Sequence, residues 1–114
     1  MKMNVNEIVL DFDVLRTNAL QASNFLKVLA NPDRLMLLCQ LSQGEKCVGD
    51  LEKLVGIKQP TLSQQLTVLR SENLVDTRRE GKLIYYSIIS KEALSVMKLL
   101  YEQYCLPTEG KEND

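Results

Sequence analysis

The sequence predicts a mainly α-helical fold with about five helices and one short β-hairpin of two strands. Leucines recur at the i, i+3, i+4 and i+7 spacing of amphipathic helices along most of the chain, whereas residues 75–88 have the composition of a hairpin. A chain of 114 residues that is 45% hydrophobic can bury one modest core, so we expect a single domain over residues 1–106. The polar segment 107–114 is expected to be disordered.

The first two predicted helices meet at a clear boundary. Asn31 and Pro32 end the first helix and start the second, because asparagine is a good N-cap and proline fits the first helical position. The first helix carries leucine and alanine at steps of four and three, a narrow seam of the kind found between paired helices: Leu15, Ala19, Ala22, Leu26 and Leu29. The second helix, about residues 32–42, should turn three leucines inward: Leu35, Leu38 and Leu41.

Residues 49–70 predict a helix-turn-helix. A short helix over residues 49–55 is followed by Gly56, which accepts the positive φ that a tight turn requires. The second helix, about residues 59–70, has Pro60 in its first turn and one buried stripe of leucines: Leu62, Leu66 and Leu69. A solvated helix face usually carries glutamate and lysine. Here it carries hydroxyls and amides, which donate and accept hydrogen bonds as base edges in a DNA major groove require: Thr61, Ser63, Gln64 and Thr67.

The segments Val75–Arg79 and Leu83–Ile88 flank a glycine-containing turn at residues 80–82, as expected for a β-hairpin with a basic tip. Taken alone, such a tip is usually only a solvated turn. Its place directly after a polar helix makes its cations candidate phosphate contacts: Arg78, Arg79 and Lys82. Tyr85 and Tyr86 alternate in the second strand, so one of them should pack inward.

The last predicted helix covers about residues 91–104. It carries more apolar surface than a small core needs, which favours a subunit interface over a ligand pocket: Leu94, Met97, Leu100, Tyr101 and Tyr104.

The net charge of -1 argues against indiscriminate nucleic-acid binding but permits a local basic patch in the hairpin. No apolar run approaches the ~20 residues that span a bilayer, and the N-terminus lacks the features of a signal peptide. We therefore expect a cytoplasmic protein with no membrane partner. In that reducing compartment the three cysteines are core residues, metal ligands or redox-active thiols.

Three segments carry a resemblance to a known family. They are Ala30-Asn31-Pro32-Asp33-Arg34-Leu35, Gln59-Pro60-Thr61-Leu62-Ser63-Gln64-Gln65-Leu66, and Arg78-Arg79-Glu80-Gly81-Lys82 with Tyr85-Tyr86. With these segments at this spacing, the chain resembles the ArsR-type (ArsR/SmtB) winged-helix transcriptional repressors over nearly its whole length. The resemblance implies a winged helix-turn-helix, a homodimer built on the first and last helices, and repression that an inducer relieves.

The resemblance also implies double-stranded operator DNA as the partner, with the second helix of the helix-turn-helix in the major groove and the hairpin on the flanking backbone. A two-fold dimer predicts a palindromic operator with half-site centres ~10 bp apart. The candidate DNA-binding residues are Gln59, Thr61, Ser63, Gln64, Thr67, Arg78, Arg79 and Lys82.

The inducer has to be inferred from the side chains that could sense it. The chain has no histidine, so the family's carboxylate/histidine metal site is impossible here. Around Cys47 the chain resembles the arsenic- and cadmium-sensing branch, but Gly49 stands where that branch has a second cysteine. A soft ion needs two or three thiolates, so we expect no metal site and no cofactor, with thiophilic-metal sensing as the alternative.

Cys39 and Cys105 resemble the cysteine pair of the persulfide-sensing BigR/SqrR branch, in which the two helices lie side by side in one protomer. The resemblance implies a low-molecular-weight persulfide or polysulfide as inducer, with a sulfur bridge between the thiols releasing the DNA. Taken alone, the residues are more typical of a buried apolar Cys39 and an incidental Cys105. A small sulfur-transfer enzyme is a further alternative. The chain lacks histidine, Cys-x-x-Cys and a glycine-rich anion loop, so we predict no enzymatic activity.

Overall fold

The computed structural model describes residues 2–5 and 8–106, so the predicted disordered tail at 107–114 lies outside the described residues. The elements in chain order are β1 (Lys2–Val5), β2 (Ile8–Asp11), α1 (Phe12–Leu29), α2 (Pro32–Leu41), β3 (Lys46–Cys47), α3 (Val48–Val55), α4 (Thr61–Ser71), β4 (Val75–Glu80), β5 (Leu83–Ile88) and α5 (Lys91–Tyr104). The predicted order of a helix-turn-helix followed by a hairpin is confirmed.

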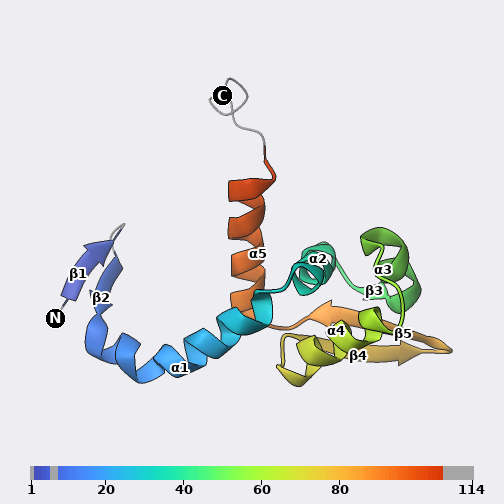
Figure 1. Ribbon diagram of the computed structural model, residues 1–114, viewed down its shortest axis with the longest axis horizontal. Coiled ribbons are helices and arrows are strands. Elements are labelled where there is room, and N and C mark those ends of the chain that lie inside the picture. Colours follow the sequence, from blue (N-terminus) through green and yellow to red (C-terminus); the bar gives the residue numbers. More distant parts are fainter. Residues whose placement is uncertain (1, 6–7, 107–114) are drawn as a thin grey trace.

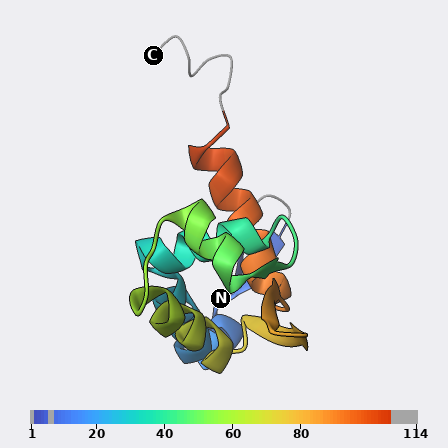
Figure 2. The same ribbon diagram turned by 90° about the vertical axis from the view of Figure 1, so that its right-hand side faces the viewer.

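The molecule has a packed body and two projecting arms. Figure 1 shows α2, α3, α4 and the β4–β5 hairpin together, and these elements are called the body below. Helix α1 extends from the body to one side, and α5 rises from it in a different direction. In the turned view of Figure 2, α5 again projects from the body. We call α1 and α5 the arms.

Local capping explains where the helices begin and end. The Asn31 side chain accepts a hydrogen bond from the Arg34 N–H (3.0 Å), and Pro32 is the first residue of α2, as predicted. Gly56 has a φ of 71° and ends α3, also as predicted. Pro60 differs from the prediction, because it lies at the cap that precedes α4 and not in the first helical turn. A missing N–H is no loss at a cap either.

The hairpin belongs to a three-stranded antiparallel sheet with the order β3-β5-β4. In this sheet Arg78 of β4 lies opposite Tyr85 of β5, which lies opposite Cys47 of β3. Gly81, with a φ of 62°, is the first residue of the tight turn between β4 and β5. The prediction of two strands missed β3, because two residues show no alternation. It also missed the antiparallel pair β1–β2, because residues 1–11 contain no glycine or proline to mark a turn.

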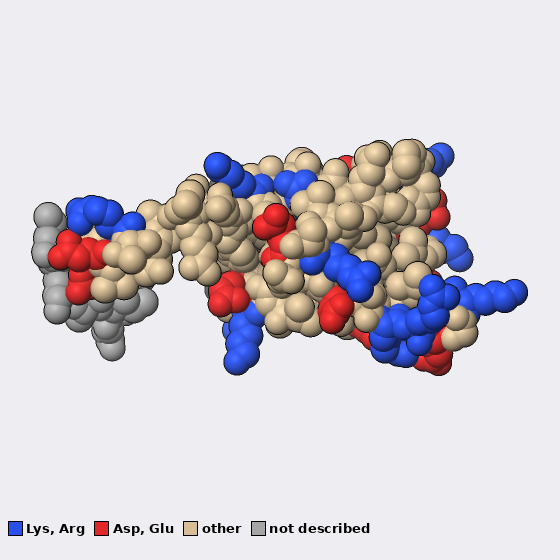
Figure 3. Space-filling model, turned by 90° about the horizontal axis from the view of Figure 1, so that it is seen from below, with Lys and Arg blue, Asp and Glu red and all other residues tan. Residues whose placement is uncertain are grey.

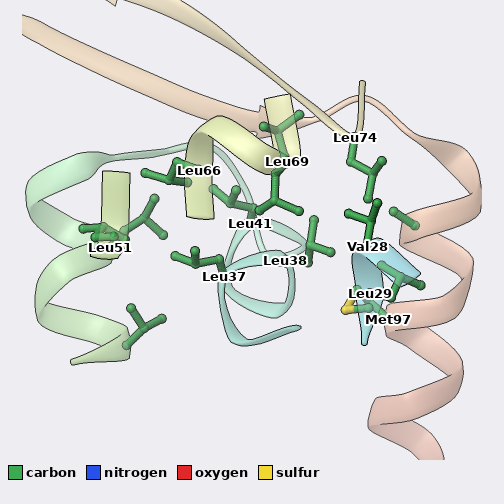
Figure 4. Close-up of a cluster of buried hydrophobic side chains, with 14 of the residues drawn as sticks. Val28, Leu29, Leu37, Leu38, Leu41, Leu51, Leu66, Leu69, Leu74 and Met97 are labelled. Carbon is green, nitrogen blue, oxygen red and sulfur yellow. The ribbon is translucent and has the colours of Figure 1, made fainter. Parts of the chain in front are cut away.

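The core lies where α2 meets the other helices. Figure 4 shows Leu37, Leu38 and Leu41 of α2 between α3 on one side and α5 on the other. The predicted inward stripe of α2 is only partly right, because Leu37 is fully buried and Leu35 only partly. Since α2 packs against α3, α4 and α5, one stripe cannot describe its buried surface. The stripe predicted for α4 is confirmed by its buried leucines: Leu62, Leu66 and Leu69.

The arms leave many apolar side chains exposed. On α1 the predicted seam is exposed up to Leu26, whose side chain is 58% exposed, and only Leu29 at its end enters the core. On α5, Leu94 and Tyr101 are exposed and Tyr104 is 75% exposed. None of the described helices combines the length and the apolar character needed to cross a membrane. Exposed apolar faces such as these are typical of surfaces that pair with another protein.

Candidate nucleic-acid interface and cysteine pair

On the outer face of α4, three polar side chains form no hydrogen bond to another described residue. Thr61, Gln64 and Thr67 are exposed, opposite the buried leucines of the same helix. Within the part of the chain that the structure describes, their side chains hydrogen-bond to no other residue. Their hydroxyl and amide groups are therefore free to donate to and accept from a ligand. Figure 3 looks onto this side of the molecule, which is largely uncharged between its acidic and basic patches.

Gln59 and Ser63 differ from these three, because they contact each other. The Gln59 side-chain oxygen accepts hydrogen bonds from the Ser63 backbone N–H (3.0 Å) and hydroxyl (2.7 Å). Gln59 thus caps α4, where Pro60 has no side-chain group that could do so. Only the Gln59 amide nitrogen and the acceptor side of the Ser63 hydroxyl remain for a ligand.

Arg78 in the hairpin is held by two carboxylates. Its Nε and Nη2 donate to Glu45 at 2.8 and 2.7 Å, and its Nη1 donates to Glu80 at 2.6 Å. The guanidinium carbon lies 4.6 Å from the ring centroid of Tyr85. Tyr86, on the other face of the strand, packs against the core, so the predicted alternation of the tyrosines is confirmed.

These contacts set the charge of the Arg78 cluster. Hydrogen bonds to Glu45, and next to Glu80, raise the pKa of Arg78, while the hydrogen bonds from Arg78 hold the pKa of Glu45 below its usual range. The phosphate contact predicted for Arg78 stays a prediction, and a phosphate there would have to compete with two carboxylates. Sequence reasoning missed Glu45, which lies 33 positions before Arg78. No local pattern signals such a pair.

Arg79 and Lys82 are the hairpin cations that remain available. Both are exposed, and neither forms an ion pair with another residue of the described ranges. Figure 3 shows lysine and arginine side chains gathered at the end of the molecule where the hairpin projects. The basic tip that the sequence predicted is therefore a real surface feature, suited to phosphate groups.

Cys39 and Cys105 line the same hollow between α2 and α5. Its volume is about 500 Å³, and its walls are apolar and aromatic side chains such as Met36, Met97 and Tyr104. Cys39 is partly buried within α2, whereas Cys105 is exposed at the C-terminal cap of α5. The third cysteine, Cys47, lies in β3 and does not line this hollow. The two cysteines that the resemblance paired therefore line one hollow, and a link between them stays a prediction.

Both thiols lie toward the C-terminal end of a helix, where the helix dipole carries partial negative charge. The residues that line the hollow include no lysine or arginine. Two thiols that line one hollow can react in sequence with a soft sulfur electrophile. Among the described residues, no three histidine, cysteine, aspartate or glutamate side chains are grouped to hold a metal ion.

Comparison with known proteins places this arrangement in a family. The model of the bacterial regulatory proteins of the arsR family matches residues 31–77. A biofilm growth-associated repressor from Agrobacterium fabrum is 46% identical over 108 residues, which cover 95% of this chain and 91% of that protein. The crystal structure of the transcriptional repressor BigR from Xylella fastidiosa has a TM-score of 0.81 and 43% identity, covering 86% of this chain and 100% of that one.

A homodimeric winged helix-turn-helix DNA-binding domain from Mycobacterium bovis, a possible ArsR-family transcriptional regulator, has the same fold. Its TM-score is 0.67 at 33% identity, covering 78% of this chain and 83% of that one. The match to the Agrobacterium repressor extends over nearly the whole sequence, including both arms. The chain therefore belongs to the arsR family of bacterial regulatory proteins.

Proposed function

We propose that the chain is a homodimeric transcriptional repressor that binds a palindromic DNA operator while Cys39 and Cys105 are thiols. It releases the operator when a low-molecular-weight persulfide or polysulfide has bridged the two. The observation that carries this proposal is the single apolar hollow lined by both cysteines. Repression and DNA binding rest on the family relationship. A reducing compartment such as the cytoplasm keeps the resting protein in the dithiol form.

DNA recognition divides between α4 and the hairpin. The free polar side chains of α4 would read base edges, and Gln64 is suited to adenine because an amide can form two hydrogen bonds with that base. Arg79 and Lys82 would hold phosphates beside the reading helix. This division predicts that α4 supplies sequence preference and the hairpin supplies salt-dependent affinity.

The arms would supply the dimer. Their exposed apolar faces are suited to burial against a second copy, and the relative from Mycobacterium bovis is a homodimer. A two-fold dimer carries two copies of α4, which enter successive major grooves about one helical turn apart. The operator should then be a palindrome whose half-site centres are separated by ~10 bp.

The bridge would form in two displacement steps. The more exposed Cys105 thiolate attacks the outer sulfur of a persulfide R–S–SH, and R–S⁻ leaves, so that Cys105 becomes a persulfide. The Cys39 thiolate then attacks the inner sulfur of that group and expels HS⁻, which leaves a Cys39–Cys105 disulfide. The two thiols are oxidised and the sulfane sulfur is reduced. If a second equivalent persulfidates Cys39 as well, one persulfide displaces HS⁻ from the other and a trisulfide bridge forms.

The bridge would act by tying the body to an arm. Helix α2 packs against α4, and α5 belongs to the proposed dimer interface, so a link between α2 and α5 changes how each α4 is held relative to its partner copy. A bias of about 2–3 kcal/mol toward the non-binding arrangement weakens operator affinity some 30- to 150-fold.

Treatment of the reduced protein with glutathione persulfide tests the mechanism. Wild type should lose its gel shift and yield a linked Cys39–Cys105 peptide in mass spectrometry, and reduction should reverse both changes. Cys39→Ser and Cys105→Ser should bind DNA when reduced and fail to release it, because a lone thiol cannot close the bridge. Release that proceeds undiminished in Cys105→Ser would exclude the two-thiol mechanism.

Cys47→Ser is the matched control. Because Cys47 lies outside the hollow, its loss should leave DNA binding and release nearly intact. If this substitution instead abolished a response to arsenite or cadmium, thiophilic-metal sensing would replace the present proposal.

A further inference from the structure

Arg34 connects three helices through its guanidinium group. The residue belongs to α2, but its Nε donates to the Val28 carbonyl of α1 at 2.6 Å and its Nη2 donates to the Lys27 carbonyl at 3.3 Å. On the other side, Nη1 donates to the Gln65 side-chain oxygen of α4 at 2.8 Å. The group is partly buried. One side chain therefore joins the end of an arm to the helix that carries the reading face.

The chemistry of each Arg34 contact favours a fixed arrangement of α1 and α4. The carbonyls of Lys27 and Val28 belong to the last turn of α1, where the helix dipole favours a cation. The Lys27 carbonyl also accepts a hydrogen bond from the Ala30 backbone N–H at 3.3 Å. Gln65 follows the exposed Gln64 and precedes the buried Leu66, so it lies at the boundary between the two faces of α4. The rigid planar guanidinium holds several acceptors in fixed directions, which an ammonium on a flexible stem does not.

A directional contact is needed at this position. The inner face of α4 packs through leucines, and the hydrophobic effect itself is non-directional, whereas a hydrogen bond constrains both a distance and an angle. Contacts with base edges, in contrast, require the reading side chains to be held within about 0.5 Å and 10–20°. Helices α1 and α4 make little direct contact with each other, so the Arg34 contacts form the main polar link between them.

We infer that Arg34 is a positioning residue for DNA recognition, which transmits the placement of the dimerisation arm α1 to the reading helix α4. In this role Arg34 acts through its contacts with α1 and Gln65. Through Gln65 it fixes the rotation of α4, and through the end of α1 it fixes the distance and angle between the two copies of α4. The inference rests on the proposed DNA binding and dimer, but not on the cysteine chemistry.

Sensitivity to half-site spacing tests this role. A duplex selected by the wild-type protein from a randomised DNA library serves as the probe, together with versions that carry one base pair more or less at the centre. One base pair shifts a half-site by about 3.4 Å and turns it by about 35°, so a rigid dimer should bind the altered duplexes at least tenfold more weakly. Failure of the wild type to select any duplex would count against the proposed function, and this outcome is distinct from those below.

Arg34→Lys keeps the charge but cannot hold all three acceptors. With the selected duplex, its affinity should fall roughly tenfold, in line with the loss of a charge-assisted hydrogen bond. The penalty for altered spacing should shrink in the same variant, because the loosened α4 adapts. Binding is measured well below the unfolding temperature, so that a loss of stability alone does not affect it. Lys53→Arg, a cation exchange on the exposed surface of α3 and on neither arm, is the control and should bind like wild type.

Gln65→Ala provides a second variant if Arg34→Lys folds poorly. It should reproduce both effects, and the double variant should add little, because both substitutions break the same contact. Arg34 would have only a structural role if the variants unfolded at lower temperature while keeping the wild-type spacing penalty. Independent, additive losses from the two substitutions would also overturn the inference.

Discussion

The body and the arms of this molecule use their apolar side chains differently. In the body, leucines such as Leu62 and Leu69 are fully buried. On α1, leucines of the same size stay half exposed, including Leu15 and Leu26. Burial contributes about 25 cal/mol for each Å² of apolar surface that is removed from water. The body therefore completes its packing within one chain, whereas the arms gain much of theirs only against another surface.

This difference separates two tasks. The body fixes the shape of one DNA-binding surface, formed by α4 and the hairpin. The arms fix how the two copies of this surface are placed in the dimer. A change at the boundary between body and arm can alter DNA affinity without unfolding either part. Cys39 in α2 and Cys105 at the end of α5 lie at that boundary, and so does Arg34 of α2, which hydrogen-bonds to the end of α1. Control of an otherwise rigid body is expected at such junctions.

A charge on an arm should have the largest effect. Leu26→Asp would place two unpaired carboxylates in a symmetric apolar interface, at a cost of several kcal/mol for each ion. The dimer dissociation constant should rise more than roughly thousandfold, as measured by sedimentation equilibrium. Leu54→Asp is the matched control, because Leu54 is 51% exposed on α3 and lies on neither arm. If the two variants were equally dimeric, α1 would not belong to the interface.

A cavity in the body should have the next largest effect. Leu69 has no exposed surface, so Leu69→Ala should lower the free energy of unfolding by about 2–5 kcal/mol. Urea unfolding at two protein concentrations separates the two regions. The loss from Leu69→Ala should be the same at both concentrations, whereas Leu26→Asp should remove the concentration dependence that dimerisation gives the wild type. A concentration-dependent loss from Leu69→Ala would mean that the core of the body also contributes to dimerisation.

Local sequence signals predicted most of the body. The leucine spacing of α4, the cap at Asn31 and the turn at Gly56 all depend on residues within a few positions of each other. The side-chain contacts between distant segments do not: Arg34 and Gln65 are 31 positions apart, and Arg78 and Glu45 are 33 apart. Hydrophobic periodicity relates residues a few positions apart, so it carries no information about such pairs. For the same reason, only the family resemblance could pair Cys39 with Cys105 from the sequence.

Within the body, α4 and the hairpin should differ in what they contribute to DNA binding. Gln64→Ala should cost about 1–3 kcal/mol of operator affinity and relax sequence preference, because it removes a base contact. Arg79→Ala should weaken specific and random DNA alike and lower the salt slope by roughly one, because it removes a phosphate contact. Fluorescence anisotropy over a range of salt concentrations measures both. Equal losses of Gln64→Ala on specific and random DNA would contradict base reading by α4.

Arg78→Ala sharpens this comparison at a single residue. If Arg78 contacts a phosphate, as the sequence predicted, its loss should lower the salt slope as Arg79→Ala does. If its role is to hold the hairpin against Glu45, affinity should fall while the salt slope stays unchanged.

The smallest effect is expected from the Glu45 carboxylate. Hydrogen bonds from Arg78 hold the pKa of Glu45 below its ordinary value of about 4.3, so folding favours the charged form. The resulting stabilisation is complete above the ordinary pKa and is lost as the pH falls through the lowered pKa of the folded state. Glu45→Gln should therefore be slightly less stable than wild type at neutral pH, and the difference should close as the pH falls below about 4.

Urea unfolding midpoints over this pH range measure the difference. Arg78→Gln is the companion variant, and its gap should be larger than that of Glu45→Gln but also close in acid, because Arg78 pairs with both Glu45 and Glu80. A gap that stayed constant into acid would mean that Glu45 contributes through packing and not through its charge. Both variants leave the arms unchanged, so the dimer dissociation constant at neutral pH should match that of wild type. A change in that constant would mean that the hairpin ion pair affects dimerisation, which would contradict the assignment of dimerisation to the arms alone.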